Sequence, residues 1–471
     1  MITTKIKTQM NPGPVIASIG IFLLSILLVG CTHFGHYPVN EPLKEYKSGY
    51  GYVPQNIVSP DNSEELLLIL SFSGGGTRAA AFSYGVLEAL KATEVTINGR
   101  NRSLLQEVDI ISSVSGGSFT AAYYGLFGDR IFEDFESRFL KKDIQWALTA
   151  RTFFNPMNWV RLSSPFFDRS DLIAEYYDKY VFGGKSFGDF LKRKGPMILI
   201  NATDMSRGTR LSFNQAFFNA LCSDLSKFPV ARACAASSAV PGVLTPITVR
   251  NYAGQCGYVI PPLKESSLTY RQKEIRDNIM TIQNSKEKPY LHLIDGGVAD
   301  NLGLRAVEEV VSSLGSFWKT LQLSGSEKVR MVAFIIVNAE KKIDDHWDKI
   351  EVVPPFAAML SNHSAIAITR YNRETVALLQ ESFEGWSKEV REGRCPPGQI
   401  STEPKSCGDI KFYLTELRFE DLEDPQERSY LNNLPTSFYL KPDEVDRLRD
   451  AARRLLEKSE DFQRLLRDLE K

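Results

Sequence analysis

Short apolar runs alternate with helical patterns through the first two thirds of the chain. In four of these runs the apolar residues are nearly continuous and rich in β-branched types, which predicts buried strands at 65–72, 108–114, 196–202 and 329–338. A helical pattern follows the first run through about Lys91, and another helix follows the second run directly. Strands that each lead into a helix predict an α/β fold, with a mostly parallel central sheet and helices on both faces.

Residues 127–190 depart from this alternation because they are rich in aromatic side chains. This stretch of 64 residues holds 16 of the chain's 51 aromatic residues, about twice its share by length. We expect a helical insertion at 126–195, and two interpretations of it stay open. The aromatic side chains form either the core of an ordinary insertion or an apolar cover, or acyl groove, beside the sheet.

The C-terminal stretch 443–471 predicts an amphipathic helical segment. Its apolar residues recur at three- and four-residue steps and form one stripe, namely Val445, Leu448, Ala452, Leu455, Phe462, Leu466 and Leu469. The other face mixes Asp and Glu with Arg, which favours packing against the chain's own fold over binding to a membrane surface.

The N-terminus carries a pattern of a different kind. Residues 15–30 are apolar and uncharged, and Lys5 and Lys7 precede them. The segment is shorter than the roughly 20 residues of a membrane-spanning helix, but its length suits the apolar region of a signal peptide. It ends in LVG followed by Cys31, which resembles the lipobox of bacterial lipoproteins. An uncleaved transmembrane anchor with a chance cysteine is the alternative.

The lipobox resemblance implies cleavage before Cys31, attachment of lipid to its sulfur and acylation of the new N-terminus. Several acyl chains anchor a protein more firmly than one chain does. We therefore expect a lipid-anchored protein of the bacterial cell envelope, and Thr32 after the cysteine fits sorting to the outer membrane.

An envelope location permits disulfide bonds. Besides Cys31 the chain has five cysteines: Cys222, Cys234, Cys256, Cys395 and Cys407. We expect Cys395 and Cys407 to pair, because they bracket a short stretch rich in Pro, Gly and Ser. Cys234 lies among small apolar residues, where we expect a buried thiol.

A candidate nucleophile stands at the end of the second predicted strand, in IISSVSGGSFTAAYYG. Ser115 lies where this strand turns into a helix, with Ser113 two residues before it and Gly117 two residues after it. This spacing is typical of a nucleophile elbow, G-x-S-x-G, in which small flanking residues let the strand and the helix approach closely. Here Ser113 replaces the first glycine.

The end of the first predicted strand carries a second turn, in LSFSGGGTRAAAFSYG. Both turns are expected at the carboxyl edge of the sheet, where α/β proteins place their sites. The N–H groups of Gly74, Gly75 and Gly76 can then face the oxygen of a substrate held at Ser115. For Arg78 two roles stay open, a positive charge for a phosphate or oxyanion and a structural salt bridge.

A serine nucleophile needs a general base. Of the five histidines, two lie near the N-terminus and none has a catalytic motif around it; they are His33, His36, His292, His346 and His363. Asp295, by contrast, ends an apolar run in LIDGGVADNLGL and is followed by two glycines that permit a close approach to another turn. We favour Asp295 as the base, and the alternative is that it only caps the turn. No group of residues has metal-ligand spacing, and we expect no metal or cofactor.

Four segments in this order resemble the patatin-like phospholipases: SGGGTR, SVSGGS, ARACAASSAVPGVLTPI and DGGVADN. The resemblance extends from about Leu66 to Val337 and implies a patatin-like three-layer fold. It also implies an acyl hydrolase without a catalytic histidine, in which Ser115 is the nucleophile, Asp295 is its partner and the three glycines form the oxyanion loop. In the third segment we expect Ser237 and Ser238 to serve packing and the turn.

This resemblance suggests how the chain divides. We expect a signal peptide at 1–31, a tether at 32–62, a patatin-like catalytic domain at 63–340 and a C-terminal extension at 341–471. A hydrophobic content of 43% supports a sizeable core. The net charge of −1, with charged residues interspersed, gives no indication of a nucleic-acid partner.

The expected function is hydrolysis of fatty-acyl esters of membrane lipids through an acyl-enzyme. Three alternatives remain: an esterase or thioesterase of the same fold that acts on other substrates, an inactive envelope binding protein, and a dinucleotide-binding protein. The last is weak, because the glycine pattern of the first turn is not followed by a suitably placed acidic residue.

Overall fold

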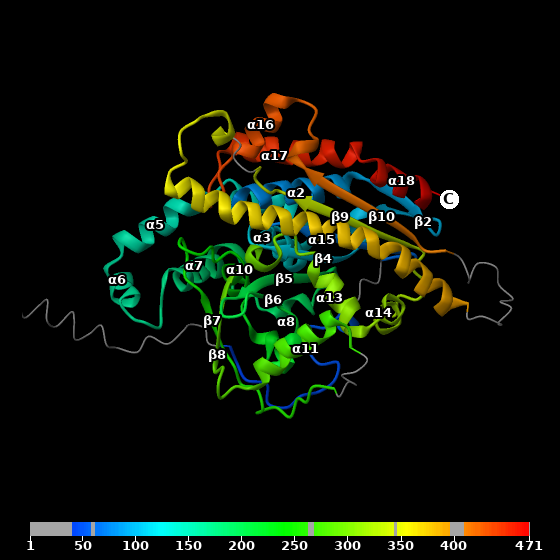
Figure 1. Cartoon of the computed structure of the whole chain (residues 1–471), viewed down its shortest axis with the longest axis horizontal. Coiled ribbons are helices and arrows are strands. Elements are labelled where there is room, and N and C mark those ends of the chain that lie inside the picture. The colour runs from blue at the N-terminus through cyan, green and yellow to red at the C-terminus, as the bar shows by residue number, and fades with distance from the viewer. Residues whose placement is uncertain (1–39, 58–61, 262–267, 343–345, 396–408, 471) are drawn as a thin grey trace, which may run out of the picture.

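The structure is a computed structural model of the whole chain (Figure 1). It describes residues 40–57, 62–261, 268–342, 346–395 and 409–470. Cys31 and the apolar segment before it lie outside this part, as does Cys407. Within the described residues, no helix is both long enough and apolar enough to cross a membrane.

The centre of the fold is an eight-stranded mixed sheet. Its strands are β1 (Leu66–Phe72), β4 (Val108–Val114), β5 (Met197–Asp204), β6 (Thr209–Ser212), β7 (Ile247–Arg250), β8 (Tyr290–Asp295), β9 (Met331–Asn338) and β10 (Lys411–Arg418). The strands β2 (Glu94–Ile97) and β3 (Arg100–Ser103) form a separate hairpin. The order across the sheet is β10-β9-β1-β4-β5-β8-β7, and β6 pairs with β5. The first five strands in this order are parallel, whereas β8 is antiparallel to both of its neighbours. The expected α/β class with a mostly parallel sheet is confirmed.

The helices account for most of the remaining described chain. They are α2 (Gly76–Ala92), α3 (Gly116–Phe127), α4 (Ile131–Phe135), α5 (Ile144–Phe154), α6 (Pro156–Leu162), α7 (Arg169–Tyr177), α8 (Phe187–Phe190), α9 (Gln215–Ala220), α10 (Val230–Ser237), α11 (Tyr270–Gln283), α12 (Gly297–Asp300), α13 (Arg305–Leu314), α14 (Phe317–Ser324), α15 (Phe356–Arg394), α16 (Pro425–Asn433), α17 (Pro442–Lys458) and α18 (Glu460–Leu469).

Two hydrophobic cores, one on each face of the sheet, make the fold three-layered. Strand residues alternate between the faces. In β1, Leu68 and Leu70 pack with α2, α3 and α17, whereas Ile69 belongs to the core formed with α13, α14 and α15. In β9, Ile335 and Ile336 divide in the same way. Strands buried on both faces need continuous apolar sequence, which is why these runs were recognisable.

The aromatic insertion is divided between core and surface. Its inner rings pack against α3, where the ring of Phe119 stacks on Phe139 at 4.5 Å between centroids and contacts the edge of Tyr177 at 4.6 Å. Along α5 and α6, by contrast, Trp146 and Trp159 are more than half exposed. The interpretation as a core therefore holds for one part of the insertion only.

The C-terminal region completes the fold. Its strand β10, which the sequence analysis did not predict, extends the parallel sheet beside β9. The predicted amphipathic stretch forms two helices, with a break at Ser459, and its apolar stripe lies in the core, where α17 packs against α2 and α18 packs against β10. The contact is close: a Cβ on Gly85 of α2 would lie 2.5 Å from the carbonyl oxygen of Arg449 in α17.

Part of the expected tether at 32–62 packs against the fold. Tyr52 is fully buried, and its hydroxyl group donates to the carbonyl of Ile198 and accepts the N–H of the same residue. Polar main-chain groups of β5 are thereby satisfied by an N-terminal side chain. Residues 40–57 are therefore part of the folded body.

A disulfide bond joins Cys222 to Cys256. The N-terminal segment binds next to it, because the N–H of Leu43 donates to the carbonyl of Cys222 and the N–H of Tyr46 to that of Cys256. The expected buried free thiol of Cys234 is confirmed. The expected partner of Cys395 lies outside the described residues.

Replacing Cys222 and Cys256 together by serine should lower the free energy of unfolding by about 3–4 kcal/mol, because the bond closes a loop across 34 residues. Urea denaturation measures the loss. Each single serine variant should lose as much as the double variant, since either one removes the same bond. Additive losses, or non-reducing peptide maps without this cross-link, would contradict the assignment.

Candidate active site

Ser115 lies in a strained turn between β4 and α3. Its backbone has φ 49° and ψ −119°, a region that residues other than glycine rarely adopt and that is found at functional turns. The next two residues must be glycines, because a side chain at either position would collide with neighbouring atoms. A Cβ on Gly116 would lie 1.9 Å from the carbonyl oxygen of Gly76, and one on Gly117 would lie 2.7 Å from the Cβ of Phe72.

Ser113 stands where the elbow pattern has its first glycine. Its side chain is fully buried, and its hydroxyl group donates a 3.0 Å hydrogen bond to the carbonyl oxygen of Leu199 on the neighbouring strand β5. A serine therefore fits at this position, because the adjacent strand satisfies its one polar group.

Asp295 reaches Ser115 from an antiparallel strand. β4 pairs in parallel with β5, with Val114 at the end of β4 opposite Asn201. β8 pairs with the next residues of β5 in the antiparallel direction and ends with Asp295 opposite Ala202. The Oγ of Ser115 donates to Oδ2 of Asp295 at 2.8 Å. The structure thus brings together the two residues that the sequence analysis selected.

The second carboxylate oxygen of Asp295 also accepts a hydrogen bond. The N–H of Gly297 donates to Oδ1 at 2.7 Å, and the neighbouring Gly296 packs so tightly that a Cβ would lie 2.3 Å from the carbonyl oxygen of Asn201. Burial raises the pKa of Asp295 to about 6, and the hydrogen bonds from Gly297 and Ser115 oppose this rise. With 7% exposure for Asp295 and 5% for Ser115, the pair is shielded from water.

The glycine turn after β1 lies directly against the elbow, but its three N–H groups are not equivalent. That of Gly74 donates to the carbonyl of Asn301 at 3.0 Å, which corrects the expectation that it faces a substrate. Within the described residues, the N–H groups of Gly75 and Gly76 have no acceptor, and neither has that of Gly116 at the start of α3. Gly116 was not predicted as a donor, although the residue after an elbow serine commonly serves in this way.

Of the two roles left open for Arg78, its surroundings fit the structural one, although its partners are main-chain carbonyls and not the carboxylate of a salt bridge. It is 1% exposed, and its guanidinium group donates to the main-chain carbonyls of Ala339 at 3.1 Å and Leu434 at 2.6 Å. Burial lowers its pKa to about 10, while Glu340 and Glu420 act in the opposite direction. Its hydrogen bonds connect the start of α2 to the end of β9 and to the C-terminal region.

Ser237, which was expected to serve packing, forms a hydrogen bond with the candidate nucleophile. Its Oγ accepts the N–H of Ser115 at 2.8 Å and donates to the carbonyl of Asn201 at 2.6 Å. The hydroxyl of Ser118 lies 3.0 Å from the same oxygen. Ser237 therefore holds the strained backbone of Ser115 in place. Its position at the end of an alanine-rich helix gave no local signal of this role.

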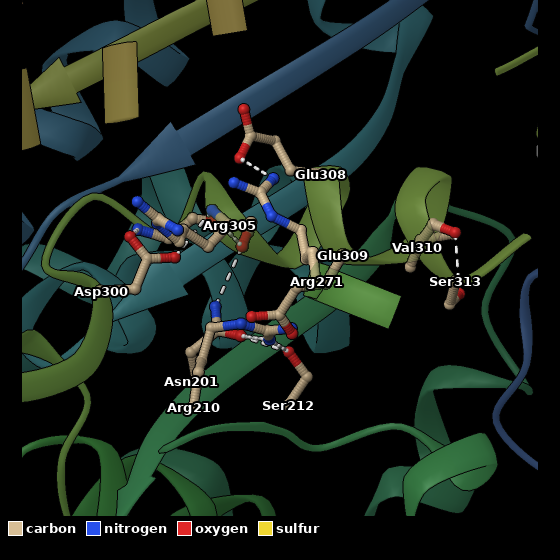
Figure 2. Close-up of polar contacts among 12 residues, drawn as sticks. Asn201, Arg210, Ser212, Arg271, Asp300, Arg305, Glu308, Glu309, Val310 and Ser313 are labelled. Atoms are coloured by element: carbon tan, nitrogen blue, oxygen red, sulfur yellow. Dashed lines mark hydrogen bonds and ion pairs between the residues drawn. The ribbon is translucent and has the colours of Figure 1, made fainter. Parts of the chain in front are cut away.

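A polar network joins β5 to β4 and to α13, and Figure 2 shows its members Asn201, Arg210 and Glu309. The side chain of Asn201 donates to Ser112 Oγ at 2.9 Å and to the carbonyl of Ser113 at 3.1 Å, and its Oδ1 accepts from Arg210 at 2.9 Å. Arg210 in turn pairs with Glu309 on α13. The network fixes β5 against β4 at Ser112 and Ser113, within three residues of Ser115.

The described residues contain no group of three or more His, Cys, Asp or Glu side chains arranged to hold a metal ion. His292 lies on β8, as expected of a strand residue, with Nδ1 3.1 Å from the hydroxyl of Thr248. A cavity of about 1030 Å³ lies farther along the sheet edge, where Asn338 of β9 and Glu416 of β10 line it together with α15. Neither Ser115 nor Asp295 lines this cavity.

Among the solved structures that match the chain, two show how limited the similarity is. Human GIVD cytosolic phospholipase A2 has 14% sequence identity and a TM-score of 0.41, with 86% of this chain and 60% of that chain covered. VipD from Legionella pneumophila has 12% identity and a TM-score of 0.25, with 90% of this chain and 73% of that chain covered. The chain thus spans about three fifths of the length of the cytosolic phospholipase. No curated protein sequence matches it.

The family comparison is more informative. The family model described as patatin-like phospholipase matches residues 70–307, just over half of the chain. The matched segment contains the glycine turn, the elbow and Asp295. The chain therefore belongs to the patatin-like phospholipase family, whose members are lipid acyl ester hydrolases.

Proposed function

We propose that the chain hydrolyses fatty-acyl esters of membrane lipids, with Ser115 as nucleophile and Asp295 as general base. The observation that carries the proposal is the 2.8 Å hydrogen bond from Ser115 Oγ to Asp295 Oδ2 in a strained, nearly enclosed turn. The site also needs donors for a developing oxyanion, and the neighbouring N–H groups that have no acceptor among the described residues can serve as these donors.

In the first step, Asp295 accepts the proton of Ser115 while Oγ forms a bond to the ester carbonyl carbon. The carbonyl oxygen becomes an oxyanion, which the N–H groups of Gly75, Gly76 and Gly116 stabilise. Gly76 and Gly116 are the first residues of α2 and α3, so two helix N-termini add favourable partial charge. The carbon–oxygen bond to the leaving alcohol then breaks, and the alcohol takes the proton from Asp295.

In the second step, water attacks the acyl group on Ser115. Asp295 accepts a proton from this water, the tetrahedral intermediate collapses, and Oγ leaves with that proton as the fatty acid is released. A carboxylate with an ordinary pKa is a weak base. The raised pKa of Asp295 brings its basicity closer to that of a histidine.

Replacing Ser115 by alanine should abolish ester hydrolysis, with a loss of at least about ten-thousandfold in kcat. A fluorophosphonate probe should label the wild-type chain on this serine and leave the variant unlabelled. The Asp295→Asn variant keeps the hydrogen-bond acceptor but loses the base, and it should lose about a thousandfold or more. Labelling that survives in the alanine variant would reject Ser115 as the nucleophile.

The pH dependence follows from the ionisation of Asp295. The base is active when ionised, and its pKa lies at about 6. We therefore expect kcat/KM for a soluble ester to be constant above this pH and to fall about tenfold per unit below it. A profile that stays flat down to pH 4.5 would contradict the assignment of Asp295.

The same carboxylate should reduce stability. Its pKa is higher in the fold than the ordinary 3.8, so the stabilising contribution of the protonated form is lost as the pH rises through about 6. At pH 8 the Asp295→Asn variant should thus match or exceed the wild type in free energy of unfolding, by up to about 3 kcal/mol. The gain should disappear near pH 4. Urea denaturation at both pH values measures it, and a destabilised variant at pH 8 would indicate a structural role.

A further inference from the structure

Helices α5 and α6 present an unusual concentration of exposed apolar side chains. Six large side chains between 39% and 73% exposed fall within 21 residues; we call them the aromatic face: Trp146, Phe153, Phe154, Met157, Trp159 and Phe166. Single exposed apolar residues are common on protein surfaces, but a contiguous group marks an interaction site. In Figure 1 the two helices extend away from the sheet at one end of the molecule.

The aromatic face is built on an ordered support. In α5 only Ile144 and Leu148 are buried, and they fix one side of the helix to the core. The indole N–H of Trp159 donates to the carbonyl of Thr152 at 2.9 Å, so that α6 is held against the end of α5. With its polar edge bonded, this ring presents apolar surface to solvent.

Arg151 gives the aromatic face one unpaired positive charge among the described residues, because the other arginine of this stretch, Arg161, pairs with Glu175. Residues 144–167 contain two arginines and no Asp or Glu, in a chain that is 24% charged and has a net charge of −1. The guanidinium group of Arg151 lies over the rings of Tyr176 and Tyr180 and donates to the hydroxyl of Tyr180 at 3.2 Å, and it makes no ion pair with a carboxylate of the described residues. Aromatic and apolar side chains with interspersed Arg are typical of segments that bind membrane interfaces.

The aromatic face is linked to the candidate active site. The next helix, α7, is linked to the loop at 239–245 by two hydrogen bonds. The Oγ of Ser170 donates to the carbonyl of Thr245 and accepts the N–H of Thr245. The same loop borders the dyad, since the carbonyl of Ala239 accepts the N–H of Asp295 at 3.0 Å. Val243 within this loop is a further exposed apolar side chain.

We propose that the aromatic face docks on the surface of a lipid bilayer whose headgroups carry anionic phosphate. The side chains of α5 and α6 enter the interfacial region, and Arg151 lies near the phosphate groups. Docking through this face holds the chain beside the acyl esters of the bilayer. The inference rests on the proposed function for the substrate, but the binding itself does not require catalysis.

The first test measures whether the two exposed tryptophans of the aromatic face reach the hydrocarbon. The full chain with Ser115→Ala, so that no lipid is hydrolysed, is reconstituted in vesicles of phosphatidylglycerol and phosphatidylethanolamine with or without brominated acyl chains. Brominated lipid should quench the tryptophan fluorescence, and adding Trp146→Phe and Trp159→Phe should remove most of the quenching. Residues 1–39 contain no tryptophan, so insertion of the N-terminal segment does not contribute. Quenching that is absent, or unchanged by the two substitutions, overturns the proposal.

The second test separates docking from catalysis. The Phe153→Ser, Phe154→Ser, Met157→Ser triple variant should hydrolyse vesicle lipid about tenfold more slowly or worse, yet hydrolyse a soluble short-chain ester at the wild-type rate. The matched control is Tyr270→Ser with Met280→Ser on α11, which removes apolar side chains that are also exposed and should change neither rate.

The outcomes of the second test are distinguishable. An unchanged vesicle rate in the triple variant overturns docking. A wild-type dimer that the triple variant converts to a monomer in light scattering also overturns it, because a second copy then covers the face. Absence of soluble-ester hydrolysis in the wild type contradicts the proposed function instead, and leaves the quenching result to decide the docking.

Discussion

The site depends on three main-chain turns that meet with almost no side chains between them. The glycine turn after β1 lies against the elbow after β4, and the turn after β8 packs on β5 at Asn201. A Cβ on Gly116 would lie 1.9 Å from the carbonyl oxygen of Gly76 in the glycine turn, and a Cβ on Gly296 would lie 2.3 Å from that of Asn201 in β5. Without this contact, the hydroxyl of Ser115 and the carboxylate of Asp295, which are 180 residues apart, would not meet.

The site contains two energetically unfavourable features, a strained backbone and a buried carboxylate. The positive φ of Ser115 strains the backbone, and the buried carboxylate of Asp295 has no cationic side chain among the causes that set its pKa. Hydrogen bonds offset both: Ser237 accepts the N–H of the strained residue, and Gly297 donates to the carboxylate. Because neutral donors stabilise the carboxylate less than a cation would, it retains the basicity that proton transfer requires.

The sequence was most informative where the physical signal is local. The strand at Val108–Val114 was predicted with the bounds that the structure shows, because it is a short apolar run bordered by turns. Periodicity carries no information on strand direction or long-range pairing, so the antiparallel entry of β8 and the addition of β10 to the sheet were not predicted. The role of Ser237 was missed for the same reason, since its partner Ser115 lies 122 residues away. For Gly74 the residue type fitted the expected role, but the actual acceptor of its N–H depends on the tertiary structure.

The aromatic insertion connects the exposed aromatic face to the candidate active site. Its inner rings pack on Phe119 of α3, the helix that begins at the elbow, so the insertion supports the nucleophile from one side. Its outer helices carry the aromatic face on the same continuous stretch of chain. A surface attached in this way to α3 and to the loop beside Asp295 sets the orientation of the dyad whenever that surface is bound. Core packing therefore accounts for the inner rings, and the proposed docking, which differs from the expected cover or acyl groove, accounts for the exposed outer ones.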